Sequence, residues 1–357
     1  MAKKDLQIAI LGAGISGLTV GVRLMERSWS NVTIYSEYIA ADGLERRPLV
    51  SEVACALWLP IWTRQKEVDD SYRAREVYWS RYSFNKFKEL DCSCGIELVH
   101  HREFYTEAEV EGGLAIPSEL SNMLPGFVGQ PVASPPPMPN DMPALTYEQS
   151  FETYVVAMPV YLSWLVHRFR ELGGKFGSGI IFRSLDDVRR IDAKLYVNAL
   201  GLAGGHIFGD ATMVGVKGQV VLCPPDPNIC CSVGVGEYCL IPRRDALVLG
   251  SLLQRTFTDS NPTQENIDLI LRVVRPWIAS GLFHRRNSTS AGKGLKTPSA
   301  RASSAGLRPF RPSGIRVELE QFDRFCVVHN YGHGGAGVSL SWGCAETVVD
   351  LLNEFDK

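Results

Sequence analysis

The stretch LQIAILGAGISG, residues 6–17, constrains the fold most, because an apolar run of strand length passes directly into closely spaced glycines. The next segment, TVGVRLMERS, has apolar residues at helical spacing, and NVTIYSE after it alternates as a strand does. Two parallel strands joined by a crossover helix explain this order. We therefore expect an α/β fold whose first forty residues form a βαβ unit of Rossmann type.

Gly12, Gly14 and Gly17 form the pattern G-x-G-x-x-G between the predicted strand and helix. The first glycine permits a tight turn, the second lets a pyrophosphate approach the backbone, and the third lets helix and strand pack closely. Phosphates bind well at a helix N-terminus, where backbone N–H groups are free. Glu37 ends the second strand and can accept hydrogen bonds from a ribose. The motif predicts dinucleotide binding and leaves both NAD and FAD open.

Composition narrows the class of partner. With 45% hydrophobic residues among 357, the chain can bury a sizeable core, and its net charge of −2 offers no broad basic field for nucleic acid or a membrane surface. No apolar run approaches the roughly 20 residues of a membrane span. The nine cysteines lack C-x-x-C spacing, so we expect reduced thiols and no metal site. We expect a cytoplasmic location, since no signal peptide or peroxisomal tripeptide is evident.

The rest of the chain suggests a second domain. Residues 46–60 form a long irregular segment that can line a flavin. Residues 61–150 begin with helical, aromatic and charged segments and continue into a proline cluster. Residues 161–174 have helical spacing, 194–205 are a buried strand running into glycines, and 217–257 alternate as an antiparallel sheet does. The polar piece 285–305 is expected to be a mobile loop.

Several stretches match one family. VNALGLAGG with KGQVV, GLRPFRPSGIRVE and HNYGHGGAGVSLSWGCAE, together with GAGISGL and SEVACALWLP, resemble the D-amino-acid and D-aspartate oxidases, FAD flavoproteins related to glycine oxidase. The likeness runs in order from about residue 6 to residue 352. It implies a discontinuous FAD-binding domain, residues 1–60, 151–216 and 306–357. It also implies a substrate domain built on an antiparallel sheet, residues 61–150 and 217–305.

The resemblance implies the site residues. Arg308 is expected to bind the substrate carboxylate through its planar fork, although Arg308, Arg311 and Arg316 could each make surface ion pairs instead. The Gly335 carbonyl is expected to accept a hydrogen bond from the substrate amine, and Tyr238 to assist at the carboxylate. The implied FAD contacts are Gly12, Gly14, Ile15, Ser16, Gly17, Glu37, Ser51, Ala56, Leu57, Phe182, Gly334, Gly335, Ala336, Gly337, Val338 and Ser339.

The implied reaction is hydride transfer from the α-carbon of a D-amino acid to flavin N5, giving a 2-oxo acid, ammonia and, after reaction with O2, hydrogen peroxide. The partners are thus an amino-acid substrate and O2, and the resemblance is compatible with a homodimer. His329 and His333 are four residues apart, but the glycines around them argue against a helical metal site, so a structural role is expected.

The sequence also departs from the family pattern. Cys239 stands where vertebrate members have a tyrosine, and Tyr238, one residue earlier, can replace it only if the strand bulges. The segment before this strand is short, which leaves little room for a lid. Leu253 stands where D-aspartate oxidases carry an arginine, and Arg255 is two residues away. Leu59 stands where vertebrate D-amino-acid oxidases have a glutamine, and Ala336 stands where the mammalian proteins have a bulky tyrosine. The pocket is therefore expected to be less polar and to accept a neutral or apolar D-amino acid.

Three alternatives remain open at this point. The chain could be a pathway-specific amine or imino-acid oxidase of glycine-oxidase type, acting on an unusual amino acid. It could also be a flavin-binding protein without oxidase activity, or an NAD-dependent dehydrogenase.

Overall fold

The computed structural model describes residues 6–40, 46, 48–60, 69–113, 115–255, 259–283 and 302–354. Most of the predicted loop at 285–305 lies outside these residues, and its described end, residues 302–305, is strand instead. Those four residues pair with a neighbouring strand from Ala302↔Leu222 to Ala305↔Gln219, which explains the difference. None of the helices in the described ranges combines the length and apolar character that a membrane span requires.

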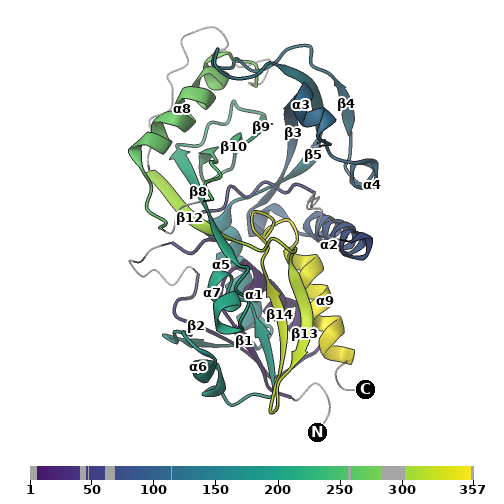
Figure 1. Ribbon diagram of the computed structural model, residues 1–357, viewed down its shortest axis with the longest axis vertical. Helices are drawn as coiled ribbons and strands as arrows, with labels where there is room; N and C mark the ends of the chain where they lie inside the picture. The colour runs from purple at the N-terminus through teal and green to yellow at the C-terminus, as the bar shows by residue number, and fades with distance from the viewer. Residues whose placement is uncertain are drawn as a thin grey trace.

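The described strands form two sheets, which lie one above the other in Figure 1. The smaller sheet has the order β13-β14-β7-β1-β2-β6. Its strands are β1 (Ile8–Leu11), β2 (Val32–Ser36), β6 (Lys175–Ser178), β7 (Leu195–Asn198), β13 (Arg316–Gln321) and β14 (Cys326–Tyr331). All its neighbouring pairs are parallel except β13 with β14. The predicted βαβ unit is therefore present, with helix α1 (Ile15–Glu26) between β1 and β2.

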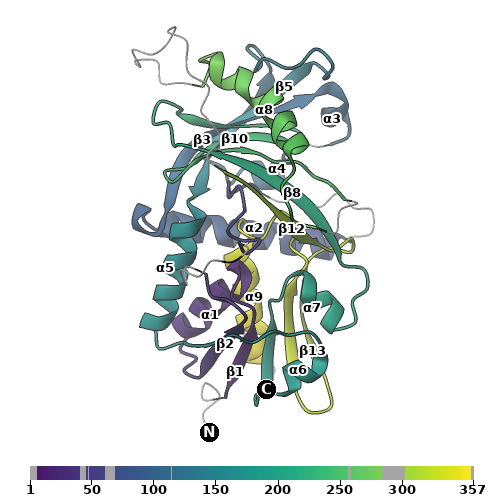
Figure 2. The ribbon, with the colours of Figure 1, turned by 90° about the vertical axis from the view of Figure 1, so that its left-hand side faces the viewer.

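Successive apolar side chains of β1 point to opposite faces of the smaller sheet, and both faces are buried. Ile8 and Ile10 pack into the larger cluster, with helices α1, α5 (Met158–Glu171) and α9 (Ser341–Glu354). Ala9 and Leu11 pack on the other side, with α6 (Leu185–Arg189) and α7 (Leu202–Ile207). Figure 2 shows the two groups of helices on opposite sides of the sheet. A continuous apolar strand of this kind is typical of a sheet covered on both faces.

The larger sheet has the order β12-β8-β11-β10-β9-β3-β5-β4. Its strands are β3 (Ile96–Thr106), β4 (Val128–Pro131), β5 (Leu145–Val156), β8 (Val214–Cys223), β9 (Cys231–Val235), β10 (Tyr238–Pro242), β11 (Leu247–Gly250) and β12 (Ala302–Phe310). It is antiparallel, as predicted, except that β3 and β9 are parallel. Helix α8 (Gln264–Ala279) covers the face that is turned away from the smaller sheet (Figure 2).

The remaining helical elements of the described structure are the long helix α2 (Asp70–Glu89) and three short ones, η2 (Cys92–Cys94), α3 (Glu107–Glu111) and α4 (Ser118–Ser121). Of these, α2 packs on α9, where Trp79 Nε1 donates to Thr347 Oγ1 at 2.9 Å and Gly343 N donates to Ser83 Oγ at 2.9 Å. A side chain at Gly343 would collide with the Trp79 backbone, so glycine allows the two helices to approach this closely.

The predicted domain boundaries do not coincide with the division between the sheets. The boundary at residues 150 and 151 falls inside β5, and the boundary at 305 and 306 falls inside β12, so both strands belong wholly to the larger sheet. Helix α2, assigned by sequence to the substrate domain, packs on the helices of the smaller sheet. Strands β3 and β5 were not predicted as such, because their charged and aromatic residues obscure the strand alternation.

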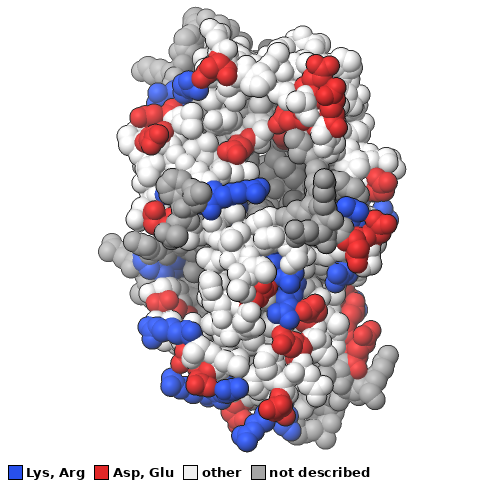
Figure 3. Space-filling model, viewed as in Figure 1, with Lys and Arg blue, Asp and Glu red and all other residues white. Residues whose placement is uncertain are grey.

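The surface visible in the orientation of Figure 1 carries basic and acidic side chains interspersed (Figure 3). On this face neither sign of charge forms an extended field, in agreement with the net charge of −2.

Candidate active site

A cavity of about 760 Å³ lies between the two sheets and is lined by residues of both. Every residue predicted for the site lines this cavity except Gly17, Ala336 and Ser339. Segments far apart in the sequence are thus brought together: the turn after β1, the segment 49–59, the strand β12 and the loop after β14.

The turn after β1 can be built only with glycine at two positions. Gly12 has φ +103, and a Cβ there would lie 2.6 Å from the carbonyl oxygen of Ala199. At Gly17 a Cβ would lie 2.0 Å from the carbonyl oxygen of Gly12. Gly17 therefore does not line the cavity, but it closes the turn that shapes it, which is the packing role assigned to the third glycine of the motif.

The start of α1 is open to the cavity. Gly14 is the N-cap residue and provides no side-chain cap, while Ile15 N donates to Ser51 Oγ at 3.0 Å. Ser16 lines the cavity next to this start, and Glu37 is exposed at the end of β2. Unfilled N–H groups at a helix start, with a carboxylate one strand away, suit the phosphates and the ribose of a dinucleotide.

The loop after β14 forms the opposite wall. Gly334 has φ +55, and its N–H donates to the Pro309 carbonyl at 2.7 Å, which ties the loop to β12. A Cβ at Gly335 would lie 3.8 Å from Arg308 Cδ, so the backbone of this glycine directly adjoins the arginine. Helix α9 begins at Ser341, after a turn in which Leu340 N donates to the Ala336 carbonyl.

Ala336 and Ser339 are buried behind this wall. The Ser339 carbonyl accepts from Trp58 Nε1 at 3.0 Å, and its Oγ accepts from Leu59 N at 3.2 Å. Ser339 therefore holds the segment 49–59 against the start of α9. Ala56 in that segment lines the cavity with φ +60, a left-handed conformation that favours glycine.

Unpaired polar atoms on the wall indicate a missing ligand. Asn330 Nδ2 and Oδ1 and His333 Nε2 are buried, and no partner is present for them in the part of the chain that the structure describes. Both residues line the cavity. Buried polar groups nearly always have a hydrogen-bond partner, so a polar cofactor in this cavity would supply what the chain does not. Together with the glycine turn and the open helix start, this fits a bound dinucleotide.

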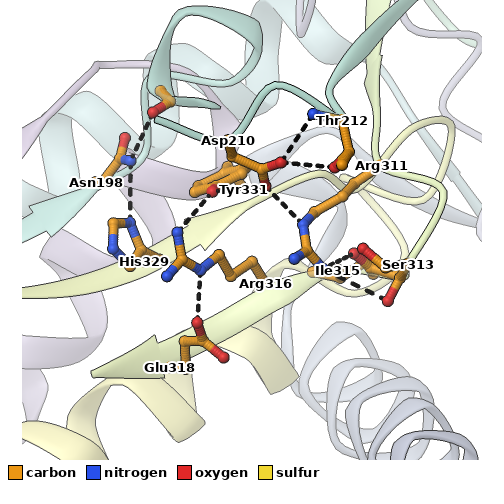
Figure 4. A network of polar contacts seen from close by, with 12 residues as sticks. Asn198, Asp210, Thr212, Arg311, Ser313, Ile315, Arg316, Glu318, His329 and Tyr331 are labelled. Carbon is orange, nitrogen blue, oxygen red and sulfur yellow. Dashed lines mark hydrogen bonds and ion pairs between the residues drawn. The ribbon is translucent and has the colours of Figure 1, made fainter. Parts of the chain in front are cut away.

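The three arginines considered from sequence differ in their partners. Arg311 binds Asp210 at 2.7 Å, and Arg316 binds Glu318 at 2.6 Å, both within the network drawn in Figure 4. Among the described residues no carboxylate pairs with Arg308, whose Nη1 donates to the Leu252 carbonyl at 3.2 Å and whose Nη2 donates to Ser251 Oγ at 2.9 Å. Arg308 is therefore positioned but not neutralised, as a residue that binds an anion must be.

The histidines have structural surroundings. His329 Nε2 contacts Glu320 Oε2 at 2.8 Å, and its Nδ1 contacts Asn198 Nδ2 at 3.2 Å, the latter drawn in Figure 4. Both ring nitrogens are thus engaged, in agreement with the structural role expected for His329. The backbone of His333 pairs with that of Phe310 in an isolated antiparallel β-bridge, and His333 lines the cavity.

The strand that carries Tyr238 lacks the bulge that would let this residue take the position of the family tyrosine. β9 and β10 pair in continuous register, Tyr238↔Val235 and Cys239↔Gly234, so the strand does not bulge there. The ring of Tyr238 packs among the hydrophobic residues beside α8, whereas Cys239 packs with Cys55 on the cavity side. Both Tyr238 and Cys239 line the cavity, and Cys239 does so from the side on which Cys55 lies. The two-residue turn between β9 and β10 also agrees with the absence of room for a lid there.

Several polar lining residues were not predicted from the sequence. His101 and Glu103 lie on β3, a strand that was not predicted, and Ser251 follows β11. Among the described lining residues Arg308 is the only lysine or arginine, while the acids are Glu37, Glu103 and Glu237. The expectation of a less polar pocket is therefore incomplete. The signal that could have revealed Glu103 is the period-two spacing of His101 and Glu103 in HHREF.

Comparison with known proteins agrees with this geometry. The family model described as FAD dependent oxidoreductase matches residues 7–351. A D-amino-acid oxidase from Dictyostelium discoideum is 26% identical over 98% of this chain and 92% of its own length. The D-aspartate oxidase of Homo sapiens is 26% identical over 98% of this chain and 95% of its own length. The crystal structure of glycine oxidase from Bacillus cereus ATCC 14579 has a TM-score of 0.70 at 17% identity, covering 99% and 96% of the two chains. The matched part of this chain includes the strands of both sheets.

Proposed function

Because the chain belongs to the family of FAD-dependent oxidoreductases, we propose that it is a D-amino-acid oxidase with its active site in the cavity between the two sheets. The predicted cofactor, FAD, and the predicted family are confirmed by the match over residues 7–351. The alternative of an NAD-dependent dehydrogenase is set aside for the same reason. The observation that carries the proposal is Arg308, a cation without a carboxylate partner in the described chain, beside the glycine loop.

Arg308 would hold the substrate by its carboxylate. Of the five N–H donors of its guanidinium, one bonds to the Leu252 carbonyl and one to Ser251 Oγ, which fixes the plane of the group and leaves the others for a ligand. The adjoining Gly335 carbonyl would accept a hydrogen bond from the substrate amine. Two anchors at neighbouring points orient the α-carbon, and orientation is the main contribution a protein makes to this reaction.

The glycine turn, the open start of α1 and Glu37 would hold the dinucleotide part of FAD. Asn330 and His333 would gain partners from the same cofactor. The chemistry that FAD supplies is acceptance of a hydride from the α-carbon, with later transfer of the electrons to O2 and formation of hydrogen peroxide. Water then hydrolyses the imino acid to a 2-oxo acid and ammonia.

D-aspartate is a poor candidate substrate. Leu253 stands where D-aspartate oxidases carry an arginine, and it lines the cavity. A second carboxylate would meet no lysine or arginine among the described lining residues besides Arg308. Leaving a charge without a partner in a cavity of this kind is costly.

The test is purification followed by an absorption spectrum and a peroxide assay with D-amino acids, their L-enantiomers, glycine, sarcosine and cyclic imino acids. We expect a flavin spectrum and peroxide release with D-amino acids only. Flavin with turnover of sarcosine or cyclic imino acids alone would support the glycine-oxidase-type alternative. Flavin without any turnover would support the inert flavin-binding protein, and either result would contradict the proposal.

A further inference from the structure

We infer that Glu103 selects substrates with a positively charged side chain, so that the cavity prefers D-lysine, D-ornithine or D-arginine over neutral amino acids of equal length. The inference rests on the proposed function, because it assumes that Arg308 binds the α-carboxylate. It changes the expectation of a neutral or apolar substrate, which was formed without knowledge of β3.

Glu103 is built into the wall of the substrate end of the cavity. On β3 it pairs with Gly234 of β9, and Gly234 pairs with Cys239 of β10, so the three positions form a row across neighbouring strands. A Cβ at Gly234 would lie 2.0 Å from Glu103 Oε2, so the carboxylate occupies space that only glycine leaves free. The carboxylate therefore extends along the sheet toward Cys239, the residue in the place of the family tyrosine.

A buried chain of hydrogen bonds orients this carboxylate. His101 is fully buried, with Nε2 2.8 Å from Glu103 Oε2 and Nδ1 2.9 Å from Ser232 Oγ. A neutral imidazole with its proton on Nε2 satisfies both contacts, because Ser232 can then donate to Nδ1. In this arrangement His101 donates to Glu103 without cancelling its negative charge.

One oxygen of the carboxylate is available. The Glu103 side chain is 17% exposed and lines the cavity, and among the described residues no donor bonds to its Oε1. A carboxylate can accept several hydrogen bonds through its two oxygens, so Oε1 can accept from a ligand ammonium or guanidinium. A charged donor is favoured there over a neutral one because charge-assisted bonds are the stronger kind.

Glu103 and Arg308 bear opposite charges in one cavity but do not pair with each other. The Glu103 carboxylate lies over Gly234 on β9, and the Arg308 guanidinium lies over Gly218 on β8, three strands away. Three strand spacings amount to about 14 Å. An amino acid whose α-carboxylate binds Arg308 and whose side chain carries a cation several methylenes away spans such a gap. A short neutral side chain, by contrast, leaves Glu103 without a partner.

The experiment compares kcat/KM of the holoenzyme for D-lysine with that for D-norleucine, which has the same carbon chain without the ammonium group. We expect the unaltered protein to favour D-lysine at least tenfold. Glu103→Gln, which keeps the size of the side chain, should reduce this ratio at least tenfold, and Glu103→Asp should give an intermediate ratio. The matched control is Glu97→Gln, a carboxylate on the same strand that does not line the described cavity.

The outcomes separate the two levels of the argument. Turnover of D-norleucine without preference for D-lysine overturns the inference and leaves the proposed function standing, whereas no turnover of any D-amino acid defeats the proposed function itself. Equal loss of kcat/KM with both substrates in Glu103→Gln would mean that Glu103 binds the α-amine, and unchanged kcat/KM values for both would mean that the carboxylate is only structural. Either result overturns the inference, and the comparison in the unaltered protein holds even if the variants fold poorly.

Discussion

The sulfur atoms of Cys55 and Cys239 lie 3.9 Å apart on the wall of the cavity that holds Arg308. Cys239 donates to Cys55, and this hydrogen bond lowers the pKa of Cys55 below its usual range, outweighing burial, with further contributions from Arg308 and Ser251. The same contact and burial raise the pKa of Cys239. Cys239, which stands where the family resemblance places a tyrosine, thus donates to the sulfur atom of Cys55.

This relationship predicts reactivity. Because the Cys239 contact lowers the pKa of Cys55, a larger fraction of Cys55 is thiolate at neutral pH than of an ordinary cysteine, and iodoacetamide should modify Cys55 in the protein without substrate. Cys239→Ala removes the donor, so the Cys55 pKa should rise and its modification at pH 7 should slow severalfold. Peptide mass spectrometry measures the rate, with exposed Cys92 as the internal reference. A ratio of the two rates that Cys239→Ala leaves unchanged would refute the assigned hydrogen bond.

Replacement of Arg308 should separate substrate binding from cofactor binding. Arg308→Lys removes the planar fork, and we expect kcat/KM for D-amino acids to fall roughly 100-fold, equivalent to about 3 kcal/mol for charged hydrogen bonds. The flavin content should stay the same, since Arg308 lies outside the glycine turn. Steady-state kinetics and the flavin-to-protein absorbance ratio are the measurements, with exposed Arg324→Lys as the control. Loss of flavin together with activity would assign Arg308 to the cofactor instead.

Two glycines should respond in opposite ways to alanine. At Gly17 a Cβ would lie 2.0 Å from the Gly12 carbonyl, so Gly17→Ala should destabilise the fold and abolish flavin binding. At Gly335 the nearest contact is an ordinary 3.8 Å, so Gly335→Ala should fold normally and lose turnover, because the added methyl group projects toward the substrate side of Arg308. Thermal unfolding and flavin content distinguish the two variants. A Gly335→Ala enzyme with full activity would remove this glycine from the substrate site.

Ala56 offers a stabilising change. Its φ of +60 costs a residue with a Cβ roughly 1–2 kcal/mol, although glycine would add flexibility to the unfolded chain. We expect Ala56→Gly to raise the free energy of unfolding by about 0.5–1 kcal/mol. Denaturant titration checks this, and a loss of stability would show that the Ala56 methyl contributes more by packing than its backbone conformation costs.

Stability should fall in mild acid because of buried histidine. Burial, with Arg316 nearby, lowers the pKa of His329 to about 4 despite the Glu320 carboxylate. The unfolded chain then binds a proton at a higher pH than the folded one, so stability decreases as the pH falls from about 6.5 to about 4, by up to about 3 kcal/mol. His329→Gln should flatten this dependence in urea titrations, whereas exposed His167→Gln should not. An equal slope in both variants would contradict the assignment.

Local pattern was enough to predict the dinucleotide turn, its helix and its neighbouring strand. Gly12 and Gly17 can be recognised in a linear sequence because the steric demands they meet arise within a few residues, and Glu37 follows at the end of the next strand. The family motifs likewise placed Arg308 and Gly335 in one site, and both line the same cavity. The parts of the site that lie within continuous motifs were therefore accessible without coordinates.

The remaining parts depend on contacts between strands distant in sequence. Glu103 meets Gly234 and Cys239 only because β3 joins β9 in a parallel pair, and Cys55 meets Cys239 only because the segment 49–59 crosses the larger sheet. Likewise, only the ion pairs of Arg311 and Arg316 distinguish them from Arg308. Side-chain periodicity reports which face of an element is buried, but it carries no information about which element covers that face. The tertiary structure alone decided the charge opposite Arg308.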